Sequence, residues 1–169
     1  MESLRSFVFA ATLLTATSIG SAAETSVQSV PDKELQAMLD KYPEAATLFY
    51  NGRPEAVKAL WSHSDDVTLS GAAGGATAKG WNDVSSRLDW ASSQFRDANG
   101  TKTIEQIQTV VSGDFAYTVQ YEHIRYHRPG QQELAKRDYR VTTIFRREPE
   151  GWRVVHRHAD TLMTRQDIR

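Results

Sequence analysis

Tyr121 and His123 are the residues of this sequence whose type and spacing fit acid–base chemistry. They end a stretch in which Phe115, Tyr117 and Val119 alternate with smaller or polar residues, a pattern typical of a β-strand with one buried face. The aromatic face is the more apolar one, so we expect it to carry Tyr117, Tyr121 and His123 into a pocket. There His123 is a candidate general acid or base, or a ligand contact. The alternative is a solvated histidine at the open end of the strand, with no function.

A metal site is the obvious hypothesis for His156 and His158, which are spaced i, i+2 on a predicted strand. Such a pair can chelate a metal ion, but a zinc site needs three or four ligands. No third histidine or carboxylate is spaced in the sequence to complete this one. We therefore predict no metal site.

Charge and cysteine content exclude several classes of function. The net charge of the 169 residues is −1, which gives no attraction to nucleic acid or to an anionic membrane. The absence of cysteine excludes disulfides, thiolate nucleophiles and cysteine-ligated metals. The glycine-rich segment 71–80 lacks the phosphate-loop pattern, and we expect no cofactor.

The first 23 residues resemble a secretory signal. Arg5 precedes a weakly polar run, and Ser21-Ala22-Ala23 places small residues where a signal peptidase cleaves. The alternative is a membrane anchor, but the run is short and rich in Ser, Thr and Gly for a bilayer span. We expect cleavage after Ala23, a loose arm over 24–31, and a periplasmic or secreted protein with no membrane association after cleavage.

The elements that position these side chains form one domain over residues 32–165. Helices are expected over 33–42, 43–50, 54–61 and 82–95, and a short strand over 65–69. Strands over 101–112, 115–123, 135–147 and 152–160 are separated by turns of hairpin spacing, which implies antiparallel neighbours. Helices followed by a meander of strands indicate an α+β fold.

Three motifs in this order resemble the SnoaL-like and ketosteroid-isomerase-like proteins of the nuclear-transport-factor-2-like superfamily. They are Gly52-x-Pro54 leading to Ala59-Leu60-Trp61 and Asp65-Asp66-Val67-Thr68-Leu69, Lys79-Gly80-Trp81 leading to Arg87-Leu88-x-Trp90, and Arg140-Val141-Thr142 leading to Gly151-Trp152-Arg153-Val154-Val155-His156-Arg157-His158-Ala159-Asp160. The resemblance implies a cone, in which a curved antiparallel sheet wraps around the N-terminal helices and encloses a pocket. It also implies a homodimer packed through the outer face of the sheet.

The same resemblance implies that Arg140, Thr142 and Arg157 lie on the concave face. From the alternation of the strands we expect Tyr121, His123, Arg140 and Arg157 to converge inside the cone, with Thr142 beside them. Arginines there would favour a carboxylate or another anionic group. The alternative is that Arg140 and Arg157 form structural ion pairs. Trp61 and Trp90 are expected either in the pocket wall or in the core. The face that carries Trp152, Val154 and His156, together with Val141, Thr143 and Phe145, is expected to point outward toward a dimer partner.

Function remains open among three classes at this point. The steroid-isomerase mechanism is not expected, because the position of its aspartate base falls on Gly71 and that of its oxyanion tyrosine on Ala45. We expect a small-molecule-binding domain whose ligand is partly apolar or anionic. The alternatives are a SnoaL-like isomerase, cyclase or hydratase using acid–base chemistry, and a dimeric scaffold without chemistry.

Overall fold

The computed structural model describes residues 32–98, 102–161, 163–165 and 167. Its elements are α1 (Lys33–Phe49), α2 (Glu55–Lys58), β1 (Thr68–Ser70), β2 (Ala78–Lys79), α3 (Trp81–Ser93), β3 (Lys102–Ser112), β4 (Phe115–His127), β5 (Leu134–Glu148) and β6 (Gly151–Asp160). The predicted signal peptide and arm lie outside the described residues. Within the described ranges, no helix is both long and apolar enough to cross a membrane.

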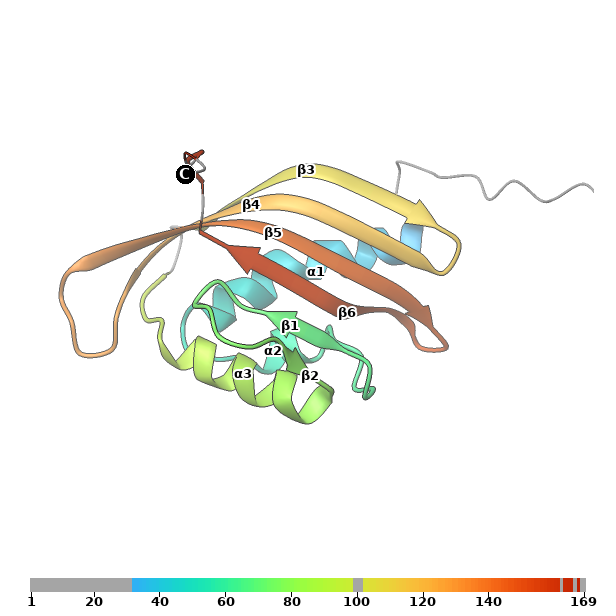
Figure 1. Cartoon of the computed structure of the whole chain (residues 1–169), viewed down its shortest axis with the longest axis horizontal. Helices are drawn as coiled ribbons and strands as arrows, with labels where there is room; N and C mark the ends of the chain where they lie inside the picture. The colour runs from blue at the N-terminus through green and yellow to red at the C-terminus, as the bar shows by residue number, and fades with distance from the viewer. Residues whose placement is uncertain (1–31, 99–101, 162, 166, 168–169) are drawn as a thin grey trace, which may run out of the picture.

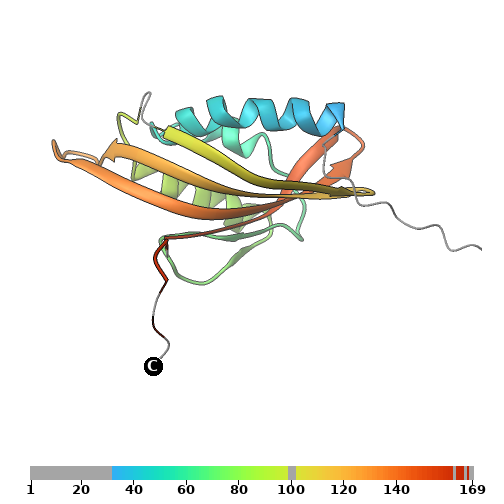
Figure 2. The ribbon, with the colours of Figure 1, turned by 90° about the horizontal axis from the view of Figure 1, so that it is seen from above.

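A single curved sheet in the order β2-β1-β6-β5-β4-β3 forms the body of the molecule. The long strands β3 to β6 make an antiparallel meander, whereas β1 lies parallel to β6, so the sheet is mixed rather than purely antiparallel. Figure 1 shows the four long strands side by side, and Figure 2 shows α1 lying along one face of the curved sheet. The α+β cone expected from the resemblance is confirmed.

α1 is one continuous helix, and the prediction of two separate helical segments on either side of Pro43 was wrong. Asp32 caps it as expected, since its Oδ1 accepts a hydrogen bond of 2.8 Å from the Leu35 amide. A proline inside a helix removes one backbone hydrogen bond and crowds the preceding turn. Here Leu35 and Met38 before it, and Ala45 and Ala46 after it, are all buried, so packing on both sides holds the helix together.

The face assignment of β4 was wrong by one residue. The even-numbered residues from Ala116 to Tyr126 are buried, whereas the side chains of Phe115 and Tyr117 are 51% and 40% exposed. The concave face, toward the helices, therefore carries Thr118, Gln120 and Glu122. A shift of one residue moves every side chain of a strand to the other face, so the aromatic residues of β4 lie on the convex face.

The face assignment of β5 was also wrong by one residue. Val141, Thr143 and Phe145 are buried on the concave face, although we expected them to point outward. Arg140 and Thr142 alternate with them and lie on the convex face. The concave faces of β4 and β5 thus meet in register.

A bulge divides β6 into two halves of opposite parity. Ile144 pairs with His156 but Phe145 pairs with Val154, so Val155 is an extra residue opposite the junction. Because of it, both Val154 and Arg157 face the helices. The prediction that Trp152 and Val154 point outward with His156 was therefore wrong, while the concave placement of Arg157 was correct.

Candidate ligand-binding site

A cavity of about 560 Å³ lies between α1, α2 and the concave face of the sheet. Apolar side chains from the helices and from the strands form its walls. They include Met38, Leu39, Phe49, Val57, Leu60, Trp61, Phe145 and Val154. The sheet contributes a polar floor of Thr118, Gln120 and Thr143. The cavity is of the size of a small-ligand pocket, with an apolar wall and a few polar groups.

Glu122 is fully buried and does not itself line this cavity, but its four hydrogen-bond partners do. Its Oε1 accepts hydrogen bonds from the Tyr42 hydroxyl at 2.7 Å and from Gln120 Nε2 at 2.7 Å. Its Oε2 accepts from the Tyr50 hydroxyl at 2.8 Å and from Arg157 Nη2 at 3.0 Å. We call these five residues the Glu122 cluster. An ionised carboxylate has about four acceptor positions, so the cluster occupies all of them.

Electrostatics keep the carboxylate of Glu122 ionised. Burial by itself would raise its pKa, but the charge of Arg157 and the hydrogen bonds from the two tyrosines and Gln120 lower it below its ordinary value. Burial, reinforced by the negative charge of Glu122, raises the pKa of both Tyr42 and Tyr50, so both phenols stay neutral donors. Burial would lower the pKa of Arg157, but Glu122 raises it. The cluster is thus a balanced ion pair held by neutral donors.

The residues predicted to form the pocket divide between the two faces of the sheet. Trp61 and Arg157 line the cavity. Trp90 is 50% exposed on α3 and lies outside it. Five others do not line it, because the parity of β4 and β5 places them on the convex face: Tyr117, Tyr121, His123, Arg140 and Thr142. The expected convergence of Tyr121, His123 and Arg140 on Arg157 does not occur.

His123 and Arg140 each have a structural partner on the convex face. His123 Nδ1 lies 2.9 Å from Asp138 Oδ1, and Arg125 Nη1 shares that oxygen at 3.3 Å. Arg140 binds Asp160 through two hydrogen bonds of 3.0 and 3.1 Å. The alternative of a structural ion pair therefore applies to Arg140, and Arg157 also forms an ion pair, with Glu122.

His156 and His158 also lie on the convex face, where β6 meets β1. His156 Nδ1 is 2.7 Å from the Thr68 hydroxyl, and burial together with the neighbouring His158 lowers the pKa of His156. Among the residues that the structure describes, no three histidine, aspartate or glutamate side chains gather as metal ligands would.

Of the Glu122 cluster, only Arg157 was predicted from the sequence as a pocket residue. Gln120 and Glu122 share one face of a strand, but the aromatic face seemed the better candidate for burial. Tyr42 and Tyr50 are eight residues apart, a spacing that places both on one stripe of a helix. That signal is visible only if α1 is taken to continue through Pro43.

The comparison with protein families gives a match to the SnoaL-like domain over residues 35–163. The chain belongs to the SnoaL-like domain family. The match covers α2, the whole sheet and all of α1 except its first two residues, so the cavity lies within the matched domain. The comparison with curated proteins found no match.

Solved structures share the fold of this SnoaL-like domain at low sequence identity. A ketosteroid isomerase-like protein from Erwinia carotovora is 17% identical, with a TM-score of 0.64 over 79% of this chain and 99% of that one. A nuclear transport factor 2-like superfamily protein from Salmonella enterica is 18% identical, with a TM-score of 0.61 over 76% of this chain and 89% of that one. A protein from Novosphingobium aromaticivorans, described as having a cystatin-like fold, is 23% identical with a TM-score of 0.55, over 78% and 86% of the two chains.

Proposed function

We propose that this chain is an exported, dimeric protein that binds a small, partly apolar organic molecule in the cavity between α1 and the sheet. The observation that carries the proposal is the cavity itself, which has an apolar wall and is also lined by the four residues that hydrogen-bond to Glu122. The ligand's apolar part packs against Leu60, Trp61 and Phe145. Its polar part reaches the polar floor of the sheet. Export rests on the sequence of the first 23 residues.

The charges around the cavity favour a neutral ligand. Arg157 is the only arginine or lysine among the described residues that line it, and Glu122 balances that charge. Asp40, an exposed residue of α1, also lines the cavity. No uncompensated positive charge is left to attract an anion. The anionic ligand that we expected from Arg140 is therefore not proposed for this cavity.

The hydrogen bonding of Glu122 and the position of His123 favour binding over catalysis. The oxygens of Glu122 are already occupied by four donors, so the carboxylate has no position left to accept a substrate proton. His123 lies on the opposite face of the sheet, paired with Asp138. No histidine occurs among the described residues that line the cavity.

Filling the cavity is expected to remove the bound molecule. Thr143 lies on the cavity floor, so Thr143→Phe places an aromatic ring in the space that the ligand occupies. Native mass spectrometry of protein purified from its natural host measures the bound mass. The matched control is Thr142→Phe, the same change at the next residue of β5 but on the convex face. A wild-type protein without any bound mass, or a Thr143→Phe variant that retains it, contradicts the proposal.

Charging the convex face is expected to separate the dimer. Phe115, Tyr117, Val119 and Ile144 make this face apolar, and the first two are exposed in the single chain. Tyr117→Glu would bury an unpaired charge in the contact. Sedimentation at micromolar concentration should give a dimer for the wild type and a monomer for this variant. Gln131→Glu, in the exposed turn between β4 and β5, adds the same charge elsewhere and should remain dimeric. A monomeric wild type would refute the dimer.

A further inference from the structure

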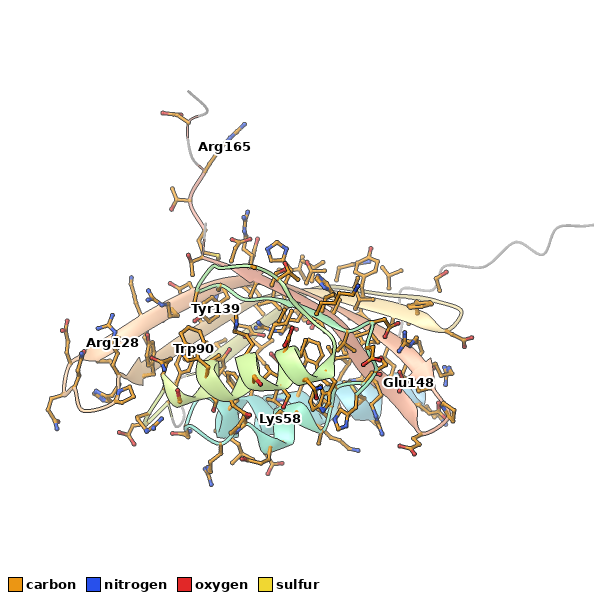
Figure 3. The ribbon with its side chains drawn as sticks, turned by 60° about the horizontal axis from the view of Figure 1, so that its bottom comes forward. Lys58, Trp90, Arg128, Tyr139, Glu148 and Arg165 are labelled. Carbon is orange, nitrogen blue, oxygen red and sulfur yellow. The ribbon has the colours of Figure 1, made fainter. Side chains whose placement is uncertain are left out.

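A second cavity, of about 480 Å³, adjoins the first. It lies between α3, the segment 71–73 and the ends of β4 and β5 nearest the turn that joins them. Aromatic side chains form much of its wall: Phe49, Tyr50, Trp90, Phe95, Tyr126 and Tyr139. Figure 3 shows Trp90, Tyr139 and Arg128 on the same side of the molecule. Phe49, Tyr50, Leu88 and Arg157 line both cavities.

Positive charge distinguishes this cavity from the first. Arg87, Arg128, Arg137 and Arg157 all line it, and none of its described lining residues is an aspartate or a glutamate. Glu122 balances Arg157, but the other three guanidinium groups have no such counter-charge in the lining. In a chain whose net charge is −1, three such arginines around one cavity are a marked local excess of positive charge.

The hydrogen bonds of Arg87 and Arg128 go to neutral acceptors. Arg87 donates to the carbonyl oxygens of Gly74 and Ala76, both at 3.3 Å. Arg128 donates to the side-chain oxygen of Gln131 at 3.3 Å. These contacts are long for a guanidinium group, whose bonds to carboxylates are usually 2.7–2.9 Å.

Five arginines outside the second cavity form salt bridges with carboxylates, whereas the described residues Arg53, Arg96 and Arg165 do not. The five are Arg125 with Asp138, Arg140 with Asp160, Arg146 with Asp66 and Glu148, Arg147 with Asp32 and Glu34, and Arg153 with Glu150. The second cavity differs in that three arginines without a salt bridge among the described residues, Arg87, Arg128 and Arg137, line one space. Its donors are placed around an aromatic space that contains no carboxylate of the described chain.

We propose that the second cavity binds an organic anion. The carboxylate or phosphate group of this ligand accepts hydrogen bonds from Arg87, Arg128 and Arg137, and its apolar part packs on the aromatic wall. Charge-assisted bonds to guanidinium groups are the strong ones in proteins, and rings such as Trp90 and Tyr139 add contact area beside them. The ligand is therefore an aryl or alkyl carboxylate, or a phosphate monoester of the same shape.

Three probes with one ring system separate these chemistries: 2-naphthoate, 2-naphthyl phosphate and the neutral 2-naphthol. Calorimetric titration of the full-length protein should show binding of at least one of the two anions. The comparison of 2-naphthoate with the phosphate identifies the preferred acidic group. Added salt should weaken the anions' binding, since it screens exposed charges. Binding of 2-naphthol as tight as that of both anions would overturn the proposal, and so would the absence of binding by both anions.

Arg137→Gln tests the site itself. It should weaken the better anion by about ten- to a hundredfold, the usual effect of losing hydrogen bonds to a charged group. The matched control is Lys136→Gln, which removes the same charge from the preceding residue of β5 on the convex face, and which should change the affinity by less than about twofold because of screening. Equal effects of the two variants would overturn the proposal.

Thr143→Phe separates this inference from the proposed function. Thr143 lines the first cavity and not the second, so the variant should bind the better anion with the wild-type affinity. If Thr143→Phe abolishes anion binding, the anion occupies the first cavity, and the second site is refuted while the first cavity remains a binding site.

Discussion

Replacing Glu122 by glutamine is expected to lower the free energy of unfolding by about 3–5 kcal/mol, the usual cost of removing one partner from a buried ion pair. The side chain keeps its size but loses its charge. Arg157, only 18% of whose side chain is exposed, then remains in the protein interior without a counter-charge. Tyr42 and Tyr50 also lose an anionic acceptor, and hydrogen bonds to charged groups are stronger than those to neutral ones. Urea denaturation followed by circular dichroism measures the loss.

The matched control for this substitution is Glu105→Gln on β3. It is the same chemical change at an exposed residue of the neighbouring strand, and exposed substitutions usually change stability by less than about 0.5 kcal/mol. An equally small effect of Glu122→Gln would show that the Glu122 cluster contributes little to the fold.

Acid is expected to cause a loss of the same order, because protonation of Glu122 also leaves Arg157 without a counter-charge. The pKa of Glu122 is lower in the folded protein than its ordinary value of 4.5. Its contribution to stability is therefore complete above about pH 4.5 and is lost as the pH falls through the lowered pKa of the folded state. The stability of the wild type should decline steeply over this range.

The variant Glu122→Gln isolates this contribution from those of other carboxylates. Asp66 is one of these, since its hydrogen bonds from Arg146 and Ser64 lower its pKa to about 2. Such groups titrate equally in the wild type and in the variant. The difference between the two free energies of unfolding should therefore shrink as the pH falls below 4.5. A difference that stays constant until the wild type unfolds would contradict the ionised state of Glu122.

The order of the elements was predictable from the sequence, because turns and alternation mark β3 to β6 clearly. Which face of β4 is buried could not be predicted in this way. Phe115, Tyr117 and Val119 are the more apolar set, and a filled core would favour their burial. The concave face instead lines a cavity, so it carries residues as small or polar as Thr118 and Gln120, and Glu122 is buried there only because its partners come from α1 and β6.

The two tyrosines in this contact show why the Glu122 cluster could not be predicted from the sequence. Tyr42 and Tyr50 meet Glu122, which is 80 and 72 residues away along the chain. No local pattern links residues so distant, and the expected break at Pro43 separated the two tyrosines. Arg157 was assigned to the correct face because the resemblance, not the alternation of β6, placed it there.

The bulge at Val155 divides β6 into two segments whose side chains can change independently of each other. Val154, before the bulge, lines the first cavity, whereas Arg157, after it, lines both cavities and Ala159 lines the second. A gapless alignment of a relative that lacks the extra residue would exchange inner and outer positions in one half only. Transfer of binding residues between relatives therefore has to be done separately on each side of residue 155. In the same way, a redesign of ligand preference can alter one half of the strand while the other keeps its register.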